Sequence, residues 1–155
     1  MSSSNSGSGG DFLAKKSSLV RAKKATTPLR DVVVVEDENI DSDRMFATMR
    51  VMYGYDVQVR RAASAAAAAD LVMEKKPDIL FLDDILKPSD DALQTIPILR
   101  RAGYDGPIVV ISGQVTKTRR TVLLAAGAAD VIHKDDVDSV RLTETIQKIF
   151  PAAGN

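Results

Sequence analysis

From residue 31 onward, short apolar runs alternate with longer segments in which apolar residues recur at helical spacing. The apolar runs are rich in β-branched residues and are bounded by Gly, Pro or acidic residues, as expected for strands buried in a sheet. The predicted strands are DVVVV at 31–35, DVQV at 56–59, DILFLD at 78–83, GPIVVIS at 106–112 and ADVIHK at 129–134.

The segments between these runs predict helices. The first helix has an apolar face of Met45, Phe46, Met49 and Met52, and the last has Val140, Leu142, Ile146 and Ile149. Pro97 does not suit a helix interior, so we place the third helix from about Thr95, which leaves a loop over 84–94. The predicted helices are 41–54, 62–76, 95–103, 116–127 and 138–150, and glycines 54, 103 and 127 suit the ends of three of them.

Five alternations of strand and helix predict an α/β fold, in which a parallel sheet is covered by helices on both faces. In such a doubly wound sheet, ligands bind at the carboxyl ends of the strands. The residues that directly follow each strand are therefore the first candidates for chemistry.

Charge divides the chain into two parts. The 155 residues carry 21 basic and 21 acidic side chains, but residues 1–30 hold six basic side chains and one acid. We predict a flexible basic arm over 1–29, one domain over 30–151 and a short tail over 152–155 without an output domain. The charges of the arm are dispersed, so they do not favour nucleic acid.

Composition excludes several other classes. The chain has no cysteine, so disulfides and thiolate metal sites are ruled out. Its apolar runs are too short to cross a membrane, and the N-terminus lacks the apolar core of a signal peptide. We therefore expect a cytoplasmic protein without a membrane partner.

Polar residues of complementary kinds follow four of the five strands. They are Glu36 and Asp37 after the first strand, Asp83 and Asp84 at the end of the third, Ser112 at the end of the fourth and Lys134 after the fifth. A buried carboxylate needs a partner, and oxygen ligands of this kind suit Mg²⁺. A lysine and a hydroxyl beside the metal would hold an anion, so the set predicts phosphoryl transfer. Each residue taken singly has a plainer interpretation as a helix cap or a solvated lysine.

These motifs resemble the receiver domain of two-component response regulators over residues 31–150. The matching segments are VVVVEDE with its acid pair, PDILFLD with its aspartate, IVVISG with its hydroxyl and GAADVIHK with its lysine. The resemblance implies a flavodoxin-like strand order of 2-1-3-4-5. It also implies that a sensor histidine kinase or histidine phosphotransfer protein donates a phosphoryl group to an aspartate.

The resemblance further implies a role for each residue. Asp37 would bind Mg²⁺ directly, Glu36 would assist, and the backbone carbonyl of Ile85 and the phosphoacceptor aspartate would complete the metal site. Ser112 would donate a hydrogen bond to the phosphoryl group, and Lys134 would neutralise its charge. Asp135 stands where the family usually has a proline, which puts the shape of that loop in doubt.

Two spacings of the family disagree on the phosphoacceptor. Counting six residues from Pro77 gives Asp83, whereas counting four residues back from Pro88 gives Asp84. Adjacent strand residues point to opposite faces, so only one of the two can meet the acid pair. We choose Asp83, because a strand is more rigid than the loop after it, and we expect Asp84 to be an exposed loop acid or a helix cap.

The leading hypothesis is a single-domain response regulator that signals by protein docking or phosphorelay, with a possible homodimer and an unknown downstream protein. Such a protein catalyses only its own phosphorylation and dephosphorylation. One alternative is an aspartate-nucleophile phosphatase, although VVVVEDE lacks the rest of that motif. Another is a pseudo-receiver that binds partners without phosphorylation. The only histidine, His133, is interpreted as a partly exposed strand-end residue.

Overall fold

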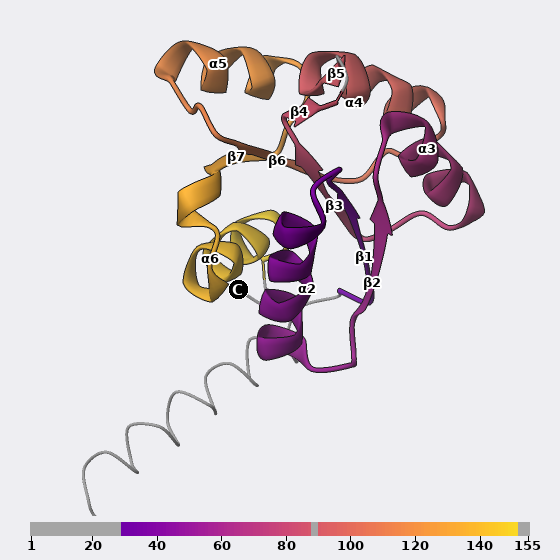
Figure 1. The fold of residues 1–155 in the computed structure, drawn as a ribbon, viewed down its shortest axis with the longest axis vertical. Helices are drawn as coiled ribbons and strands as arrows, with labels where there is room; N and C mark the ends of the chain where they lie inside the picture. The colour runs from indigo at the N-terminus through magenta and orange to yellow at the C-terminus, as the bar shows by residue number, and fades with distance from the viewer. Residues whose placement is uncertain (1–28, 88–89, 152–155) are drawn as a thin grey trace, which may run out of the picture.

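A computed structural model describes residues 29–87 and 90–151 (Figure 1). The predicted arm, apart from Leu29, and the predicted tail lie outside the described residues. Leu29 itself is buried in the core, so the folded domain begins at least one residue earlier than predicted. No helix in the described ranges is long and apolar enough to cross a membrane.

One parallel sheet of five strands forms the centre of the domain. Its order is β2-β1-β3-β6-β7, which is the predicted order of 2-1-3-4-5 for the five predicted strands. The strands are β1 (Asp31–Val35), β2 (Gln58–Ala62), β3 (Ile79–Asp83), β6 (Ile108–Ser112) and β7 (Asp130–His133). All four neighbouring pairs run parallel, so the carboxyl ends of the strands meet at one edge.

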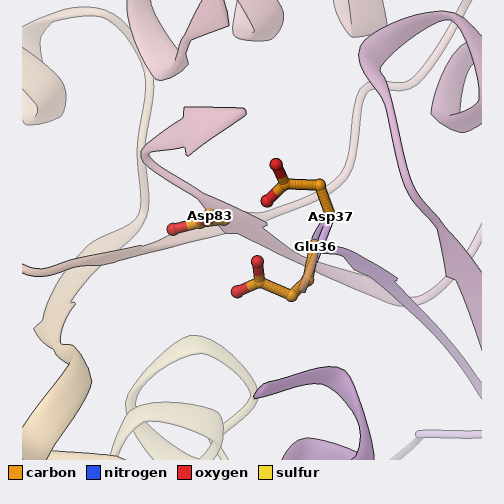
Figure 2. A group of neighbouring side chains, drawn as sticks. All are labelled: Glu36, Asp37 and Asp83. Atoms are coloured by element: carbon orange, nitrogen blue, oxygen red, sulfur yellow. The ribbon is translucent and has the colours of Figure 1, made fainter. Parts of the chain in front are cut away.

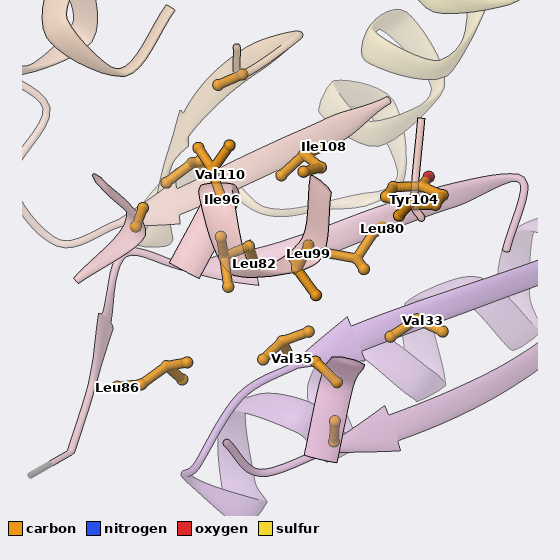
Figure 3. Packing of buried hydrophobic residues seen from close by; sticks show 14 of the residues in the cluster. Val33, Val35, Leu80, Leu82, Leu86, Ile96, Leu99, Tyr104, Ile108 and Val110 are labelled. Atoms are coloured by element: carbon orange, nitrogen blue, oxygen red, sulfur yellow. The ribbon is translucent and has the colours of Figure 1, made fainter. Parts of the chain in front are cut away.

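Five helices cover the two faces of this sheet (Figure 1). The helices are α2 (Asn39–Tyr53), α3 (Ala65–Glu74), α4 (Ala92–Arg101), α5 (Lys117–Ala125) and α6 (Ser139–Ile149). α2 and α6 pack on one face and α3, α4 and α5 on the other, because alternate residues of each strand join two separate cores. Figure 3 shows the core beneath α3 and α4, in which Val33 and Val35 lie opposite Leu80 and Leu82.

Several element boundaries in the first half differ from prediction by one to three residues. β2 begins at Gln58 rather than 56, since Gln58 is the residue in register with Asp31 of β1. α3 begins at Ala65 rather than 62, because the Ser64 side chain accepts a hydrogen bond from the Ala67 amide and caps the helix. β2 also ends at Ala62 rather than 59, so Ala62 lies in the strand and not in the predicted helix.

The predicted boundary of α4 is wrong by one turn. Asp91 and Gln94 form a capping box that starts the helix at Ala92, and Pro97 lies inside the helix. Burial of Ile96 and Leu99 offsets the backbone hydrogen bond that Pro97 cannot make.

The segment before α4 and the face of α6 also differ from prediction. Part of the predicted loop forms a small antiparallel pair, β4 (Ile85–Leu86) with β5 (Asp90–Asp91). A 3-10 turn, η1 (Lys134–Asp136), follows β7. In α6, Leu142 and Ile146 are buried as predicted, but Val140 is 63% exposed, so its assignment to the apolar face is wrong.

Candidate functional site

Three carboxylates meet at the carboxyl edge of the sheet (Figure 2). Glu36 and Asp37 directly follow β1, and Asp83 is the last residue of the neighbouring strand β3. One oxygen of each side chain lies within 4.8 Å of the others, and Glu36 and Asp83 are buried. Three hard oxygen donors at this spacing are a suitable set for one divalent cation.

Lys134 brings a positive charge to this acid cluster. Its Nζ lies 3.4 Å from Oδ1 of Asp83, 3.5 Å from Oδ2 of Asp41 and 4.0 Å from Oε1 of Glu36. One ammonium group therefore faces three carboxylates. Negative charge remains in excess, which favours a further cation at the same place.

The electrostatics of the buried acids reflect this excess. Burial, together with the neighbouring Asp83, raises the pKa of Glu36 to about 8, and burial also raises the pKa of Asp83. Burial would lower the pKa of Lys134, but Asp83, Glu36 and Asp41 outweigh it and raise the pKa. Without a cation, burial therefore disfavours the simultaneous ionisation of Glu36 and Asp83.

Asp37 has a different partner, which sequence reasoning missed. The backbone N–H of Lys87 donates to Oδ2 of Asp37 at 3.1 Å, and Lys87 Nζ lies 3.1 Å from Oε1 of Glu38. Burial is the largest single effect and would raise the pKa of Asp37, but the Lys87 N–H bond and the hydrogen bond with Glu36 together outweigh it and lower the pKa. No periodic pattern marks Lys87, since it reaches Asp37 only through the β4–β5 turn.

Asp84 faces away from the acid cluster, and the prediction that it is exposed is wrong. It is only 3% exposed. Arg119 donates two hydrogen bonds to it, from Nε to Oδ2 at 3.0 Å and from Nη2 to Oδ1 at 2.5 Å. Burial would raise the pKa of Asp84, but hydrogen bonds from Arg119 and Ser112 outweigh it and lower the pKa. The structure thus places Asp83 with the acid pair and gives Asp84 a separate ion pair. The basic stretch TKTRRT was the only sequence sign of Arg119.

Ser112 is buried at the end of β6, next to β3. Its hydroxyl lies 3.0 Å from Oδ2 of Asp84, and it accepts a hydrogen bond from the Gln114 amide at 3.1 Å. Ser112 therefore stands at the predicted edge of the sheet, with its hydroxyl directed to Asp84.

An open pocket of about 690 Å³ lies over this edge. Its lining includes Asp83, Ile85, Ser112, Arg119 and Lys134, so an anion held at Asp83 would meet a hydroxyl and cationic groups. Ile85 begins β4 and its side chain is 57% exposed. His133 is partly exposed as predicted, and its Nδ1 accepts a hydrogen bond from the Asp135 amide.

Comparison with known proteins agrees with this geometry. A family model described as response regulator receiver domain matches residues 32–147. The BeF3-activated receiver domain of Klebsiella pneumoniae RstA is similar in structure, with 24% identity and a TM-score of 0.67 over 79% of this chain and 99% of that one. A LuxR-family DNA-binding response regulator from Staphylococcus aureus is also similar, with 17% identity and a TM-score of 0.66 over 78% of this chain and 98% of that one.

A third similar structure comes from a complex. It is the receiver domain of Saccharomyces cerevisiae Ssk1, crystallised with the histidine phosphotransfer protein Ypd1. The identity is 18% and the TM-score 0.67, over 80% of this chain and 90% of that chain. At these identities the structural likeness supports the fold.

Proposed function

The chain belongs to the response regulator receiver domain family, and from that premise we propose that it accepts a phosphoryl group on Asp83. The donor is a sensor histidine kinase or a histidine phosphotransfer protein. The output passes by protein docking or by phosphorelay. The only chemistry that the domain performs is its own phosphorylation and dephosphorylation, in the cytoplasm.

The contrast between the two adjacent aspartates carries this proposal. Asp83 lies with Glu36 and Asp37 and 3.4 Å from Lys134, at the floor of an open pocket. Asp84 is already neutralised by Arg119. Both aspartates are buried and line the same pocket, but Asp84 is held by two Arg119 bonds whereas Asp83 faces a single lysine. A nucleophile needs a carboxylate that is not consumed by a permanent ion pair, and Asp83 meets that condition better than Asp84 does.

In the transfer step, a carboxylate oxygen of Asp83 attacks the phosphorus of the donor phosphohistidine. The P–O bond forms as the P–N bond breaks, and the electron pair of that bond stays on the histidine nitrogen. Lys134 faces the oxygen atoms of the new acyl phosphate and offsets their charge. The proposed role of Ser112 is to donate a hydrogen bond to one phosphoryl oxygen.

The acid cluster fits Mg²⁺. Glu36, Asp37 and Asp83 supply the oxygen ligands, and the backbone carbonyl of Ile85 is the proposed fourth protein ligand. When bound, Mg²⁺ neutralises the charge that gathers at the carboxylates and at the phosphoryl oxygens. The raised pKa of Glu36 and of Asp83 supports this proposal, because a bound cation would favour the ionised form of both residues.

The family and one structural relative support the proposed class of partner. The Ssk1 receiver, which has the same fold, was crystallised with a histidine phosphotransfer protein. Asp83 is buried but lines the open pocket at the carboxyl edge of the sheet, and such a donor would approach through this pocket.

The test is incubation of the full chain with acetyl phosphate and Mg²⁺, followed by intact mass spectrometry and peptide mapping. We expect one added phosphoryl group, located on Asp83 and absent when EDTA is present. Continuous turnover of an external phosphate ester would instead indicate a phosphatase. A chain that never gains a phosphoryl group would indicate a binding module.

A further inference from the structure

Ser112 is held by a buried carboxylate in the unmodified protein. Its Oγ lies 3.0 Å from Oδ2 of Asp84 and 3.2 Å from the carbonyl oxygen of Gln114. A hydroxyl has one proton to donate, and a bond to a charged carboxylate is stronger than one to a neutral carbonyl. In this state the Ser112 hydroxyl therefore donates its hydrogen bond to Asp84.

Arg119 keeps Asp84 in place for that contact. The guanidinium forms two bonds to Asp84 and a third contact, at 3.3 Å, to Asp91 at the start of α4. Asp84 also lies 3.4 Å from the Ala92 amide. With partners on both carboxylate oxygens, Asp84 has little freedom to turn away from Ser112.

The same ion pair attaches α5 to the sheet. Leu123 is the only buried residue of α5 among its nine residues, so apolar packing holds this helix weakly. Arg119 in its first turn reaches Asp84 at the end of β3, and Arg120 reaches the Val131 carbonyl of β7 at 2.9 Å. The position of α5 thus depends on the pairing of Arg119 with Asp84.

The proposed function requires the Ser112 hydroxyl to donate its hydrogen bond to a phosphoryl oxygen instead of to Asp84. A phosphoryl group on Asp83 can receive the Ser112 hydrogen bond only if Asp84 loses it. Two anionic acceptors, on the last residue of β3 and on the residue after it, therefore compete for a single buried donor.

We propose that Asp84 and Arg119 are positioning residues that retain the Ser112 hydroxyl in the unmodified protein, so that a phosphoryl group on Asp83 must displace it. This inference rests on the proposed function of Asp83. The Ser112–Asp84 hydrogen bond then opposes the phosphorylated state, and we call this effect the restraint. If this hydrogen bond is weakened, a phosphoryl group or a phosphoryl mimic should bind more tightly at Asp83.

Beryllium fluoride with Mg²⁺ mimics an aspartyl phosphate and tests the restraint by binding. Its adduct is titrated by fluorine NMR in the full chain for wild type, Asp84→Asn, Ser112→Ala and the double variant. We expect Asp84→Asn to tighten the apparent dissociation constant about fivefold in the wild-type background, the scale expected for a lost charge-assisted hydrogen bond. In the Ser112→Ala background the same substitution should have little effect, because the competing donor is gone.

This double-mutant cycle separates positioning from charge. An equal tightening in both backgrounds would mean that Asp84 acts only through its charge or by freeing Arg119, and would overturn the proposal. No tightening in either background would overturn it as well. Asp84→Asn preserves the shape of the side chain, and a melting scan of each variant confirms that it is folded before titration.

Arg119→Lys provides an independent check. This substitution keeps the positive charge but loses the bidentate hydrogen bonding to Asp84. We therefore expect a smaller decrease in the apparent dissociation constant, about twofold. A dissociation constant equal to that of wild type would remove Arg119 from the proposal. If wild type itself forms no adduct, the proposed function fails and the restraint falls with it. If wild type binds and Asp84→Asn binds equally, only the restraint fails.

Discussion

Two clusters of buried charge lie at opposite ends of the sheet and have opposite composition. At the carboxyl end, Glu36, Asp37 and Asp83 lie together, and one ammonium group, that of Lys134, faces Glu36 and Asp83. At the amino end of β7, the fully buried Asp130 is the only acid of a cluster that holds three cations and a hydroxyl. Its partners are Arg120 at 3.2 Å, Arg141 at 3.1 Å, Lys148 at 3.4 Å and Thr145 at 3.0 Å.

The pKa values of the acids diverge accordingly. Burial raises the pKa of Glu36 to about 8, and the nearby carboxylate of Asp83 adds to it. Burial acts in the same direction on Asp130, but hydrogen bonds from Arg141, the Val131 amide and Thr145 outweigh it and lower the pKa to about 2. A carboxylate surrounded by donors has nothing left for a ligand, whereas an acid cluster short of cations is suited to bind one. The cluster around Asp130 is therefore suited to stabilising the fold, and the acid cluster is suited to binding a cation.

The largest expected effect lies in the acid cluster. Asp83→Asn should abolish phosphoryl uptake from acetyl phosphate, because the amide is not a nucleophile, while the fold stays intact. Intact mass spectrometry measures the uptake. Asp84→Asn is the matched control, one residue away, and should still take up the phosphoryl group. The reverse result would transfer the role of phosphoacceptor to Asp84.

The next effect concerns stability at the other cluster. Asp130→Asn leaves Arg120, Arg141 and Lys148 without their shared anion, and we expect it to lower the free energy of unfolding by about 3 kcal/mol. Urea denaturation measures the change. Asp37→Asn is the control in the acid cluster. It should cost far less than Asp130→Asn, because Asp37 is only partly buried and Asn retains an oxygen that can accept the Lys87 N–H bond. Equal losses in both variants would erase the distinction between the clusters.

The pH dependence should have opposite signs at the two clusters. Glu36 keeps its proton in the folded state up to about pH 8, whereas its ordinary pKa is 4.5. The stability from this group is therefore full below pH 4.5 and is lost as the pH rises toward 8. We expect the metal-free protein to lose on the order of 2 kcal/mol between pH 5 and pH 9, as measured by urea denaturation in EDTA.

Glu36→Gln removes the titrating group and should flatten this alkaline loss. For Asp130 the sign is reversed, since its pKa is lowered from 3.8 to about 2. The stability from Asp130 is present above pH 3.8 and is lost as the pH falls toward 2. An alkaline loss that persists in Glu36→Gln would show that other groups cause it.

The smallest effect is expected from one exposed member of the cationic cluster. Lys148 is 60% exposed and is one of three cations on Asp130. Lys148→Met should therefore change the free energy of unfolding by no more than about 0.5 kcal/mol, and added salt should reduce the difference further. A loss as large as that of Asp130→Asn would mean that the three cations are not interchangeable.

Local patterns in the sequence determined most of the architecture. β-branched runs specify buried strands, helical spacing specifies faces, and five alternations leave few topologies. For that reason the existence and order of the five strands were predicted correctly, although β2 lies two to three residues later than predicted. The candidate residues at the strand ends were also identifiable, because the carboxyl ends of parallel strands meet. The start of α4 was missed, since burial of Ile96 and Leu99 outweighed the local preference of Pro97.

Only the tertiary structure decided which partner each of the acids at the carboxyl edge of the sheet has. Asp37 accepts its hydrogen bond from Lys87, 50 positions away, and Asp84 pairs with Arg119, 35 positions away. Such contacts depend on strand register and on where α5 and the β4–β5 turn pack, and local periodicity carries no information about either. The partners of a carboxylate also decide whether its pKa is raised or lowered. The sequence thus determined where the acids gather, and the packing decided which of them remains available to a ligand.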